Sequence, residues 1–217
     1  MANPHPCIAL IPARDFRSGK SRLADVLSDD ERAELGKWMF ERVLRAAGSA
    51  VGVDEIAVLS DGDSVLSITE KNGAVGIRCP ARELNEDLEA GQRWALERKA
   101  RTILVIPADL PALEPPDIDA MIGQGDERRY PGGCAVMVSS PDGGTNGLFI
   151  RPAGRLAFHF GPDSFARHRD AARSSHLPFI SFQNSGFGLD VDTPSDLTVL
   201  SERGIPLPKW LAAISLP

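Results

Sequence analysis

RTILVIPADLPAL, residues 101 to 113, is the stretch that decides the fold. Thr102 to Ile106 is an unbroken apolar run rich in β-branched residues, which suits a strand buried on both faces of a mainly parallel sheet. The run stops at Pro107, and a carboxylate, Asp109, follows two residues later. Because open α/β sheets bind ligands just beyond the carboxyl ends of their strands, Asp109 is a candidate functional residue. The alternative is an aspartate that only starts a turn or caps the next helix.

The length and composition allow one ordinary α/β domain, and two small domains are possible but not required. The chain has 217 residues, of which 42% are hydrophobic and 25% charged, enough for a sizeable core without disorder. A net charge of −6 argues against a nucleic-acid-binding protein held by a broad basic surface. There is no membrane-spanning run and no secretory leader, so we expect a cytoplasmic protein. The three isolated cysteines are expected to be buried free thiols rather than a metal or disulfide set.

Hydrophobic periodicity predicts alternating strands and helices in the first half of the chain. Such units imply a parallel sheet with right-handed crossovers. Strands are expected over 7–11, 56–59, 75–78, 102–106, 134–138, 148–150 and 179–182. Helices are expected over 20–27, from a Ser28–Glu31 capping box onward, over 64–71 and 85–98, after Pro115, over about 163–175, and from Pro194. In the helix over 85–98 we expect Leu88, Ala95 and Leu96 to face inward and Gly91 to make a close contact. The tail from Pro206 is expected to pack loosely.

The loop after the first strand is a candidate phosphate site. Gly19-Lys20-Ser21 resembles the end of a P-loop, but Arg14 stands where that motif needs a glycine, so a Walker-type NTPase is excluded. No dinucleotide-binding G-x-G-x-x-G follows a strand either. What remains is a basic loop with Arg14, Arg17, Lys20 and Arg22, which would bind a polyphosphate through its cations and backbone N–H groups. A merely solvated basic loop is an equal alternative.

Two further segments carry polar residues at useful spacing. Asp190 and Asp192 alternate along an extended segment, so their carboxylates point the same way and would repel unless a cation such as Mg²⁺ lies between them. The alternative is a helix N-cap by Asp192 or Thr193 ahead of Pro194. The turns over 142–146 and 161–165 contain glycines that let backbone amides approach an anion, although either turn alone is most simply a tight connection.

Together these segments resemble the guanylyltransferases of deazaflavin coenzyme F-420 biosynthesis, which belong to the single-domain nucleotidyltransferases with a GT-A-like fold. The resemblance runs from about Ile8 to Leu200. It rests on KSRL (20–23), LN (84–85), PADLP (107–111), DGGTN (142–146), FGPDSFARH (160–168) and LDVDTP (189–194). Such enzymes join GTP to a small phosphorylated acid and release pyrophosphate. The acid is phosphoenolpyruvate in bacterial members, 2-phospho-L-lactate in archaeal ones and 3-phospho-D-glycerate in a few.

The resemblance implies a role for particular residues of this sequence. Lys20, Asp109 and Asp192 would be the catalytic residues. Asp109, Asp190 and Asp192 would bind Mg²⁺. Nucleotide binding falls to Pro12, Ala13, Arg14, Lys20, Arg22, Ser60, Asp61, Pro80, Leu84 and Asn85. Thr145, Gly161 and Ser164 would bind the acceptor acid. The single domain, 1–217, would then comprise a nucleotide-binding half (1–125), an acceptor-binding half (126–205) and a tail (206–217), in which Trp210 could join a homodimer interface.

The chain departs from the family pattern at two positions. The family usually has Pro-Val-Lys where this chain has Pro12-Ala13-Arg14, and a glycine is common where Asp163 stands.

Two functions from other classes remain as alternatives. A GT-A glycosyltransferase would need a D-x-D motif after the strand over 102–106, where Pro107 stands instead. A non-catalytic nucleotide-binding module would bind GTP without turnover.

Overall fold

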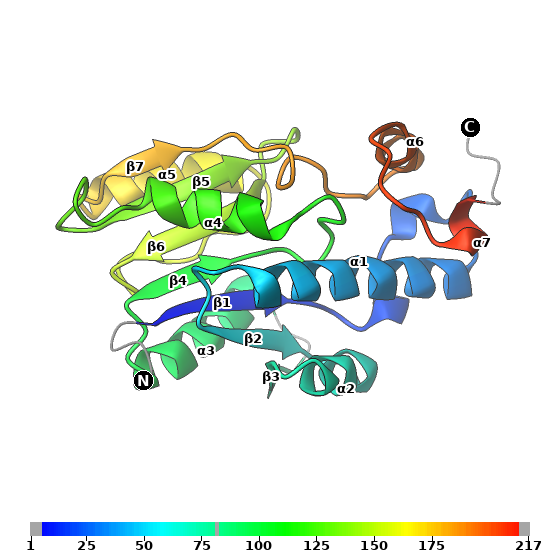
Figure 1. Ribbon diagram of the computed structural model, residues 1–217, viewed down its shortest axis with the longest axis horizontal. Helices are drawn as coiled ribbons and strands as arrows, with labels where there is room; N and C mark the ends of the chain where they lie inside the picture. Colours follow the sequence, from blue (N-terminus) through cyan, green and yellow to red (C-terminus); the bar gives the residue numbers. More distant parts are fainter. Residues whose placement is uncertain (1–5, 81–82, 213–217) are drawn as a thin grey trace.

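A seven-stranded sheet organises the molecule, with strand order β3-β2-β1-β4-β6-β5-β7 (Figure 1). The computed structural model describes residues 6–80 and 83–212. The strands are β1 (Cys7–Pro12), β2 (Glu55–Ser60), β3 (Val75–Arg78), β4 (Thr102–Val105), β5 (Cys134–Ser139), β6 (Thr145–Arg151) and β7 (Phe179–Ser181). Strand β6 is antiparallel to its neighbours β4 and β5, and the other strand pairs are parallel. The expected single-domain α/β fold with a mostly parallel sheet is therefore confirmed.

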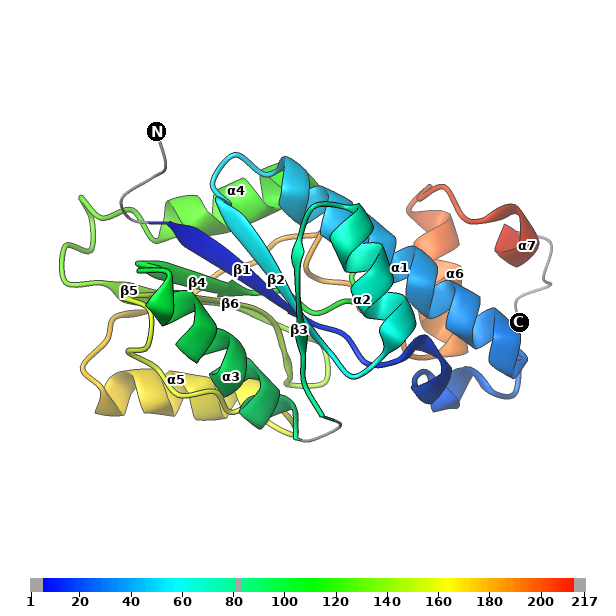
Figure 2. The same cartoon turned by 90° about the horizontal axis from the view of Figure 1, so that it is seen from below.

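Helices cover both faces of the sheet. They are α1 (Asp29–Ser49), α2 (Asp63–Lys71), α3 (Leu84–Glu97), α4 (Pro115–Gln124), α5 (Ser164–Ser174), α6 (Pro194–Glu202) and α7 (Lys209–Ala212). Figure 2 shows α3 and α5 on one face of the sheet and α1 and α4 on the other. Each face has its own core: Phe40 and Val43 of α1 pack with Ile118 of α4, whereas Leu88 of α3 and Ala172 of α5 pack on the opposite side.

The direction of β6 decides what meets at the functional edge of the sheet. The carboxyl ends of β1, β2 and β4 lie at one edge because these strands are parallel. Strand β6 runs the other way, so its first residue, Thr145, lies at that same edge. The short turn over 140–144 between β5 and β6 produces this reversal, since a hairpin connection joins antiparallel strands. Segments far apart in the sequence are thereby brought to one place.

Several local sequence signals form the structures they predict. Ser28 and Glu31 make both hydrogen bonds of the capping box at the start of α1. Pro115 lies in the first turn of α4. Gly91 provides a close contact of α3 with the sheet, because a Cβ there would lie 2.9 Å from a Leu59 methyl group. The three cysteines are buried and free, and burial, with the nearby Asp54 charge, raises the pKa of the Cys7 thiol to about 12.

The helix predicted over 20–27 is wrong. The chain forms only a 3₁₀ turn, Ser21–Leu23, followed by hydrogen-bonded turns. Lys20 has left-handed backbone angles (φ 61°, ψ 37°), which cannot belong to a right-handed helix. The apolar spacing that suggested a helix instead serves packing, since Leu23 and Leu27 are buried against α1.

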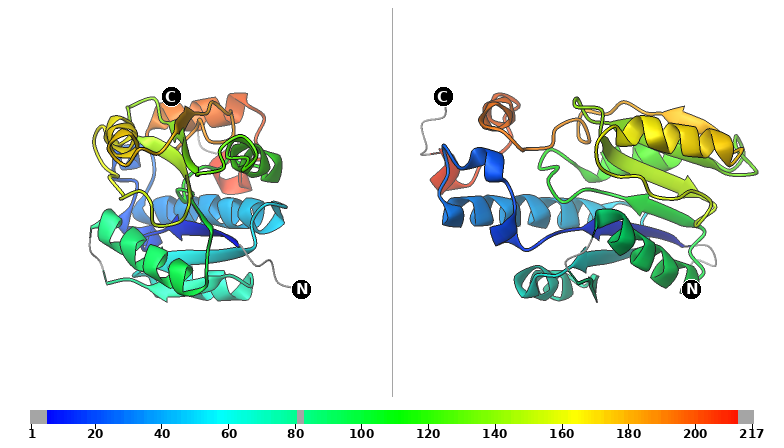
Figure 3. Two further views of the ribbon diagram at one scale, coloured as in Figure 1. Left: turned by 90° about the vertical axis from the view of Figure 1, so that its left-hand side faces the viewer. Right: turned by 180° about the vertical axis from the view of Figure 1, so that it is seen from behind.

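Two packing predictions are also wrong. Leu96 is 43% exposed. The side of α3 that faces the sheet is formed by Leu88, Gly91 and Ala95, and Leu96 lies outside it. The tail does not pack loosely up to residue 212, because Leu211 is fully buried with Leu197 and Leu200. Figure 3 shows α6, α7 and the amino end of α1 gathered at one end of the molecule. The remainder of the tail, 213–217, lies outside the described residues.

In the ranges 6–80 and 83–212, no helix is both long enough and apolar enough to cross a bilayer.

Candidate active site

A cavity of about 390 Å³ opens at the carboxyl edge of β1, β2 and β4. Its walls come from the loops after these three strands, from α1 and from the first turn of α3. It brings together many of the residues named from the sequence: Pro12, Ala13, Arg14, Lys20, Ser60, Asp61, Leu84, Asp109 and Asp192. This position at the point where the strand order reverses is the one that open α/β sheets use for ligands.

Lys20 lies between two of the predicted carboxylates. Its Nζ donates to Asp109 Oδ2 and to Asp192 Oδ1, both at 2.7 Å. The lysine side chain is 12% exposed, whereas Asp109 and Asp192 are 31% and 42% exposed. Burial alone would lower the pKa of Lys20, but the two carboxylates together raise it above its ordinary value. The loop after β1 therefore delivers a fixed positive charge to the end of the cavity.

Asp190 is the third carboxylate of this region. The Asn146 amide donates to Asp190 Oδ1 at 3.2 Å and to the Phe187 carbonyl at 3.0 Å. Burial raises the pKa of Asp190, the Asn146 hydrogen bond opposes this, and the charges of Asp109 and Asp192 raise it further. The segment after β7 is also held there by a backbone bond from Val191 N–H to the Asp109 carbonyl, at 3.3 Å.

The carboxylates of Asp109 and Asp192 are the kind of ligand that Mg²⁺ prefers, but both of them bind the Lys20 ammonium instead. Asp109 and Asp192 offer hard carboxylate oxygens on two sides of one point, and Mg²⁺ in phosphoryl-transfer sites uses one or two such groups with substrate phosphates and water. Among the residues that the structure describes, no three His, Cys, Asp or Glu side chains are already arranged to hold an ion. Asp109 and Asp192 could hold a divalent cation only if Lys20 moved away from them.

The helix-capping alternative is wrong for Asp109 and Asp192, but its Thr193 form is confirmed. Glu114, not Asp109, is the N-cap of α4. Thr193, not Asp192, is the N-cap of α6, in a capping box with Asp196. The carboxylates of Asp109 and Asp192 are consequently left to face Lys20.

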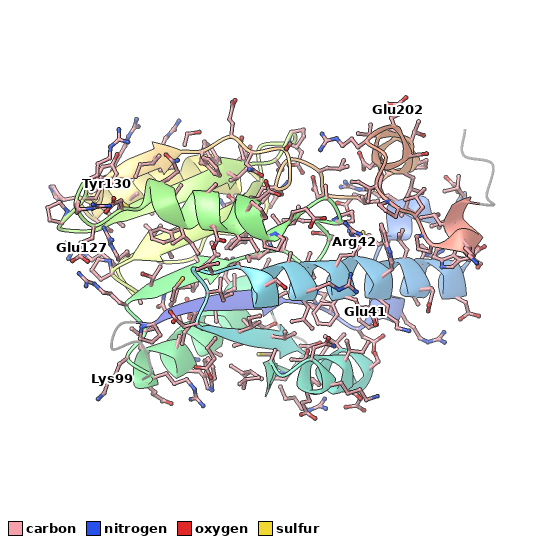
Figure 4. All side chains as sticks on the ribbon, viewed as in Figure 1. Glu41, Arg42, Lys99, Glu127, Tyr130 and Glu202 are labelled. Atoms are coloured by element: carbon pink, nitrogen blue, oxygen red, sulfur yellow. The ribbon has the colours of Figure 1, made fainter. Side chains whose placement is uncertain are left out.

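The loop that carries Asp109 is tied down from the neighbouring helix. Arg42 of α1, labelled in Figure 4, donates from Nε to the Pro111 carbonyl at 2.6 Å and from Nη2 to Glu114 at 3.1 Å. Because these bonds span the loop between β4 and α4, they limit how far Asp109 can move.

Of the predicted acceptor residues, Thr145 and Ser164 form a buried pair beside the cavity rather than on its lining, whereas Gly161 is exposed. Thr145 Oγ1 lies 2.9 Å from Ser164 Oγ, and both residues are buried. Gly161 has a positive φ of 116° in the loop just before α5. This loop is clamped to α3, since Asn85 accepts from the Phe160 N–H at 2.7 Å and donates to the Phe160 carbonyl at 3.1 Å. Asn85 therefore orders the cavity rim instead of lining the cavity.

Two other predicted nucleotide-binding residues also lie off the cavity. Arg22 is exposed and lies near Asp142, whose pKa is lowered chiefly by the Ser140 hydroxyl and also by the Arg22 charge. Pro80 lines a separate surface hollow with Cys79 and Arg93. Of the expected 80–85 wall, residues 81 and 82 lie outside the described part of the chain.

Sequence reasoning missed several residues of the site. Asp87 and Phe160 line the cavity, as do Phe16 and Phe40. Asp87 could have been predicted from the sequence, because it lies three residues after Leu84 and therefore on the same face of the helix. Asn146 and His168 stand in quoted motifs but had no assigned role, since their partners come from distant segments.

Comparison with known proteins gives a consistent result. The family model described as "Guanylyl transferase CofC like" matches residues 7–204. The phosphoenolpyruvate guanylyltransferase of Sphaerobacter thermophilus is 38% identical over 194 residues, covering 89% of this chain and 92% of its own. That of Rubrobacter xylanophilus is 39% identical over 199 residues, covering 90% and 94%. The 2-phospho-L-lactate guanylyltransferase of Methanobrevibacter ruminantium is 26% identical over 223 residues, covering 96% and 91%.

Solved structures support the fold. A candidate nucleotide-diphospho-sugar transferase from Desulfovibrio desulfuricans G20 superposes with a TM-score of 0.74 at 16% identity, covering 98% of this chain and 92% of its own. At this identity the likeness is one of fold alone.

Proposed function

Because this chain belongs to the family of CofC-like guanylyl transferases, we propose that it transfers GMP from GTP to a small phosphorylated acid, phosphoenolpyruvate being favoured, with release of pyrophosphate. The observation that carries this proposal is the convergence of Lys20, Asp109 and Asp192 at one end of the cavity. We also propose that the product enters deazaflavin coenzyme F-420 biosynthesis in the cytoplasm, where GTP and phosphorylated acids are available.

The reaction needs no general base. The phosphate of the acceptor is already an anion at neutral pH, so one of its oxygens can attack the α-phosphorus of GTP directly. A P–O bond forms to that oxygen, the bond between the α-phosphorus and the oxygen bridging to the β-phosphate breaks, and pyrophosphate leaves with the electron pair. Rate enhancement would then come from alignment of the two substrates and neutralisation of their charge.

Each charged residue has a separate part in this scheme. Lys20 would move from its two carboxylates onto the phosphates of GTP and neutralise charge there. Asp109 and Asp192, with Asp190 beside them, would hold Mg²⁺. When bound, Mg²⁺ supplies Lewis-acid polarisation and charge neutralisation of the phosphate oxygens. Arg42 would keep the Asp109 loop in place.

The rest of the cavity would receive the nucleoside. Pro12, Ala13 and Leu84 offer apolar contacts, and Ser60 and Asp61 offer polar ones. Asn85 supports this wall through Phe160, which lines the cavity. We further propose that Thr145, Gly161 and Ser164 contribute to acceptor binding, because they lie at the edge of the sheet where β6 begins.

A substrate panel tests the function. Pyrophosphate release is measured with GTP, ATP, CTP and UTP, each combined with phosphoenolpyruvate, 2-phospho-L-lactate or 3-phospho-D-glycerate in the presence of Mg²⁺. We expect GTP with phosphoenolpyruvate to give the highest kcat/KM. Turnover with 2-phospho-L-lactate instead would identify the other acceptor found among the relatives. Preference for CTP or UTP, or absence of turnover with every pair, would refute the proposal.

A further inference from the structure

His168 is a fully buried histidine that the proposed reaction does not use directly. It lies in α5, and its Nδ1 is 3.2 Å from Thr145 Oγ1. Thr145 Oγ1 in turn lies 2.9 Å from Ser164 Oγ. The three side chains thus form a continuous chain of hydrogen bonds between α5 and the start of β6. A buried polar chain of this kind is costly unless each member is paired, so the loss of one partner affects the others.

The backbone fixes the tautomer of the imidazole ring. The His159 N–H donates to His168 Nε2 at 2.8 Å, so Nε2 must carry a lone pair. Burial, with smaller effects of the His159 and Arg167 charges, lowers the pKa of His168 to about 4, which keeps the ring neutral near pH 7. The single ring proton therefore lies on Nδ1, which faces Thr145.

The tautomer makes Nδ1 the donor toward Thr145 Oγ1, and a backbone hydrogen bond with Ser164 also holds the ring. Thr145 Oγ1 and Ser164 Oγ pair with each other, and either hydroxyl group can be the donor. Within the described part of the chain, Ser164 Oγ has no second side-chain partner. The imidazole ring therefore holds both hydroxyl groups in place at the start of β6.

This cluster adjoins the candidate active site on two sides. The rings of Phe160 and His168 pack edge to face with centroids 4.9 Å apart, and Phe160 lines the cavity. Asn146, the residue after Thr145, donates to Asp190. A change at His168 can therefore reach the site through the Phe160 ring, or through Thr145 and the adjoining Asn146.

We propose that His168 is a positioning residue that holds the hydroxyl groups of Thr145 and Ser164 in place for binding of the phosphorylated acceptor acid. The inference rests on the proposed function, because that function supplies the anionic acceptor. His168 touches no substrate itself and acts through Thr145.

The first test reads the tautomer without any assay of activity. Nitrogen NMR of ¹⁵N-histidine-labelled protein, with His168 assigned by comparison with His168→Gln, should show a protonated Nδ1 and an unprotonated Nε2 near pH 7. An Nε2–H tautomer at His168 would overturn the proposal. Because this measurement uses the wild-type protein, it is decisive even if a variant fails to fold.

The second test separates the two substrates kinetically. The amide of glutamine superposes on the Nε2 side of histidine, so His168→Gln keeps an acceptor for the His159 N–H and loses the donor to Thr145. Asparagine superposes on the Nδ1 side, so His168→Asn restores that donor. We expect His168→Gln to raise the KM for phosphoenolpyruvate about tenfold, on the scale of one lost hydrogen bond, with the KM for GTP unchanged. His168→Asn should recover much of this loss.

The controls distinguish the possible failures. Arg173→Gln, an exposed change on the same helix, should leave both KM values unchanged. An equal rise of both KM values in His168→Gln, or no rise in either, would contradict a positioning role. If wild-type protein releases no pyrophosphate from GTP with any of the three acids, the proposed function itself fails, which is a different outcome from an active wild type with an unaffected variant.

Discussion

The Lys20 ammonium and the Asp192 carboxylate, 172 positions apart in the sequence, meet at 2.7 Å at the end of the cavity. Asp109 completes the arrangement from the other side of the ammonium, also at 2.7 Å. A lysine shared by two partly exposed carboxylates is a poor device for stability alone, because desolvation offsets much of the Coulomb attraction. We propose instead that it serves as a cation site, in which a phosphate ligand draws the lysine away and leaves the carboxylates to a metal ion.

Loss of either carboxylate should abolish most of the activity. We expect Asp109→Ala and Asp192→Ala each to lower kcat on the order of 100-fold or more, the usual scale for removing one electrostatic stabiliser. Neither residue caps a helix, so circular dichroism and the melting temperature should change little. Asp25→Asn, an exposed aspartate outside the cavity, serves as the control. Near-normal turnover by folded Asp192→Ala would rule out its role.

Replacing Lys20 should strengthen metal binding in the absence of nucleotide. In the free protein the ammonium satisfies both carboxylates, so a divalent cation must first displace it. Lys20→Met keeps the apolar stem and removes the charge. We expect Mn²⁺, measured by titration calorimetry or by its electron paramagnetic resonance signal, to bind about tenfold tighter or more, equivalent to about 1.4 kcal/mol.

The same lysine change should have the opposite effect on turnover. Lys20→Met should lower kcat/KM strongly because the phosphates lose a cation. Lys37→Met, at a half-exposed lysine of α1 paired with Glu34, should change neither metal affinity nor turnover. Equal Mn²⁺ affinity in wild type and Lys20→Met would show that Lys20 does not occupy the cation position.

The sequence predicted those parts of the molecule that depend on local pattern. The β-branched run before Pro107 gave the central strand and placed Asp109 at its carboxyl end. Capping residues such as Ser28 marked helix starts, and Gly91 marked a close approach of helix and sheet. These signals act within a few residues of their source, so they can be read without knowing the rest of the fold.

What could not be predicted depends on contacts between distant segments. The side chain of Lys20 is held by carboxylates 89 and 172 positions away, and the helical periodicity in 20–27 gave no sign of these contacts. The link from Asn146 to Asp190 and that from Asn85 to Phe160 likewise join separate elements. The resemblance to a family supplied residues for the site, but it could not indicate that Thr145 and Ser164 are bonded to a buried histidine.

The buried His168 should make the folded state less stable as the pH falls. Its pKa is about 4 in the folded protein, below the ordinary value near 6.5 expected after unfolding. Between these values the unfolded chain binds more protons, so the free energy of unfolding decreases as pH drops through this window. From about pH 7 to about pH 5 the contribution of this one group is about 2 kcal/mol.

Urea unfolding of wild type and His168→Gln at both pH values measures that contribution. The glutamine variant should lose less stability on acidification, by about the same 2 kcal/mol. His176→Gln, which removes an exposed histidine, should follow the wild type. Parallel pH profiles of wild type and His168→Gln would show that His168 titrates normally.

The contact of α3 with the sheet should tolerate no branched side chain at Gly91. A Cβ at this position would lie 2.9 and 3.0 Å from the Leu59 methyl groups and 3.3 Å from a Leu10 methyl group, all in a packed core. We expect Gly91→Val to lower the free energy of unfolding by about 1–3 kcal/mol, the usual range for an overpacked core. Gly123→Ala in α4 is the matched control, because no atom lies within 4 Å of the added Cβ. That change should stabilise by up to about 1 kcal/mol through helix propensity. Both are measured by chemical denaturation, and a Gly91→Val protein as stable as the wild type would mean that α3 can move away from β2 without cost.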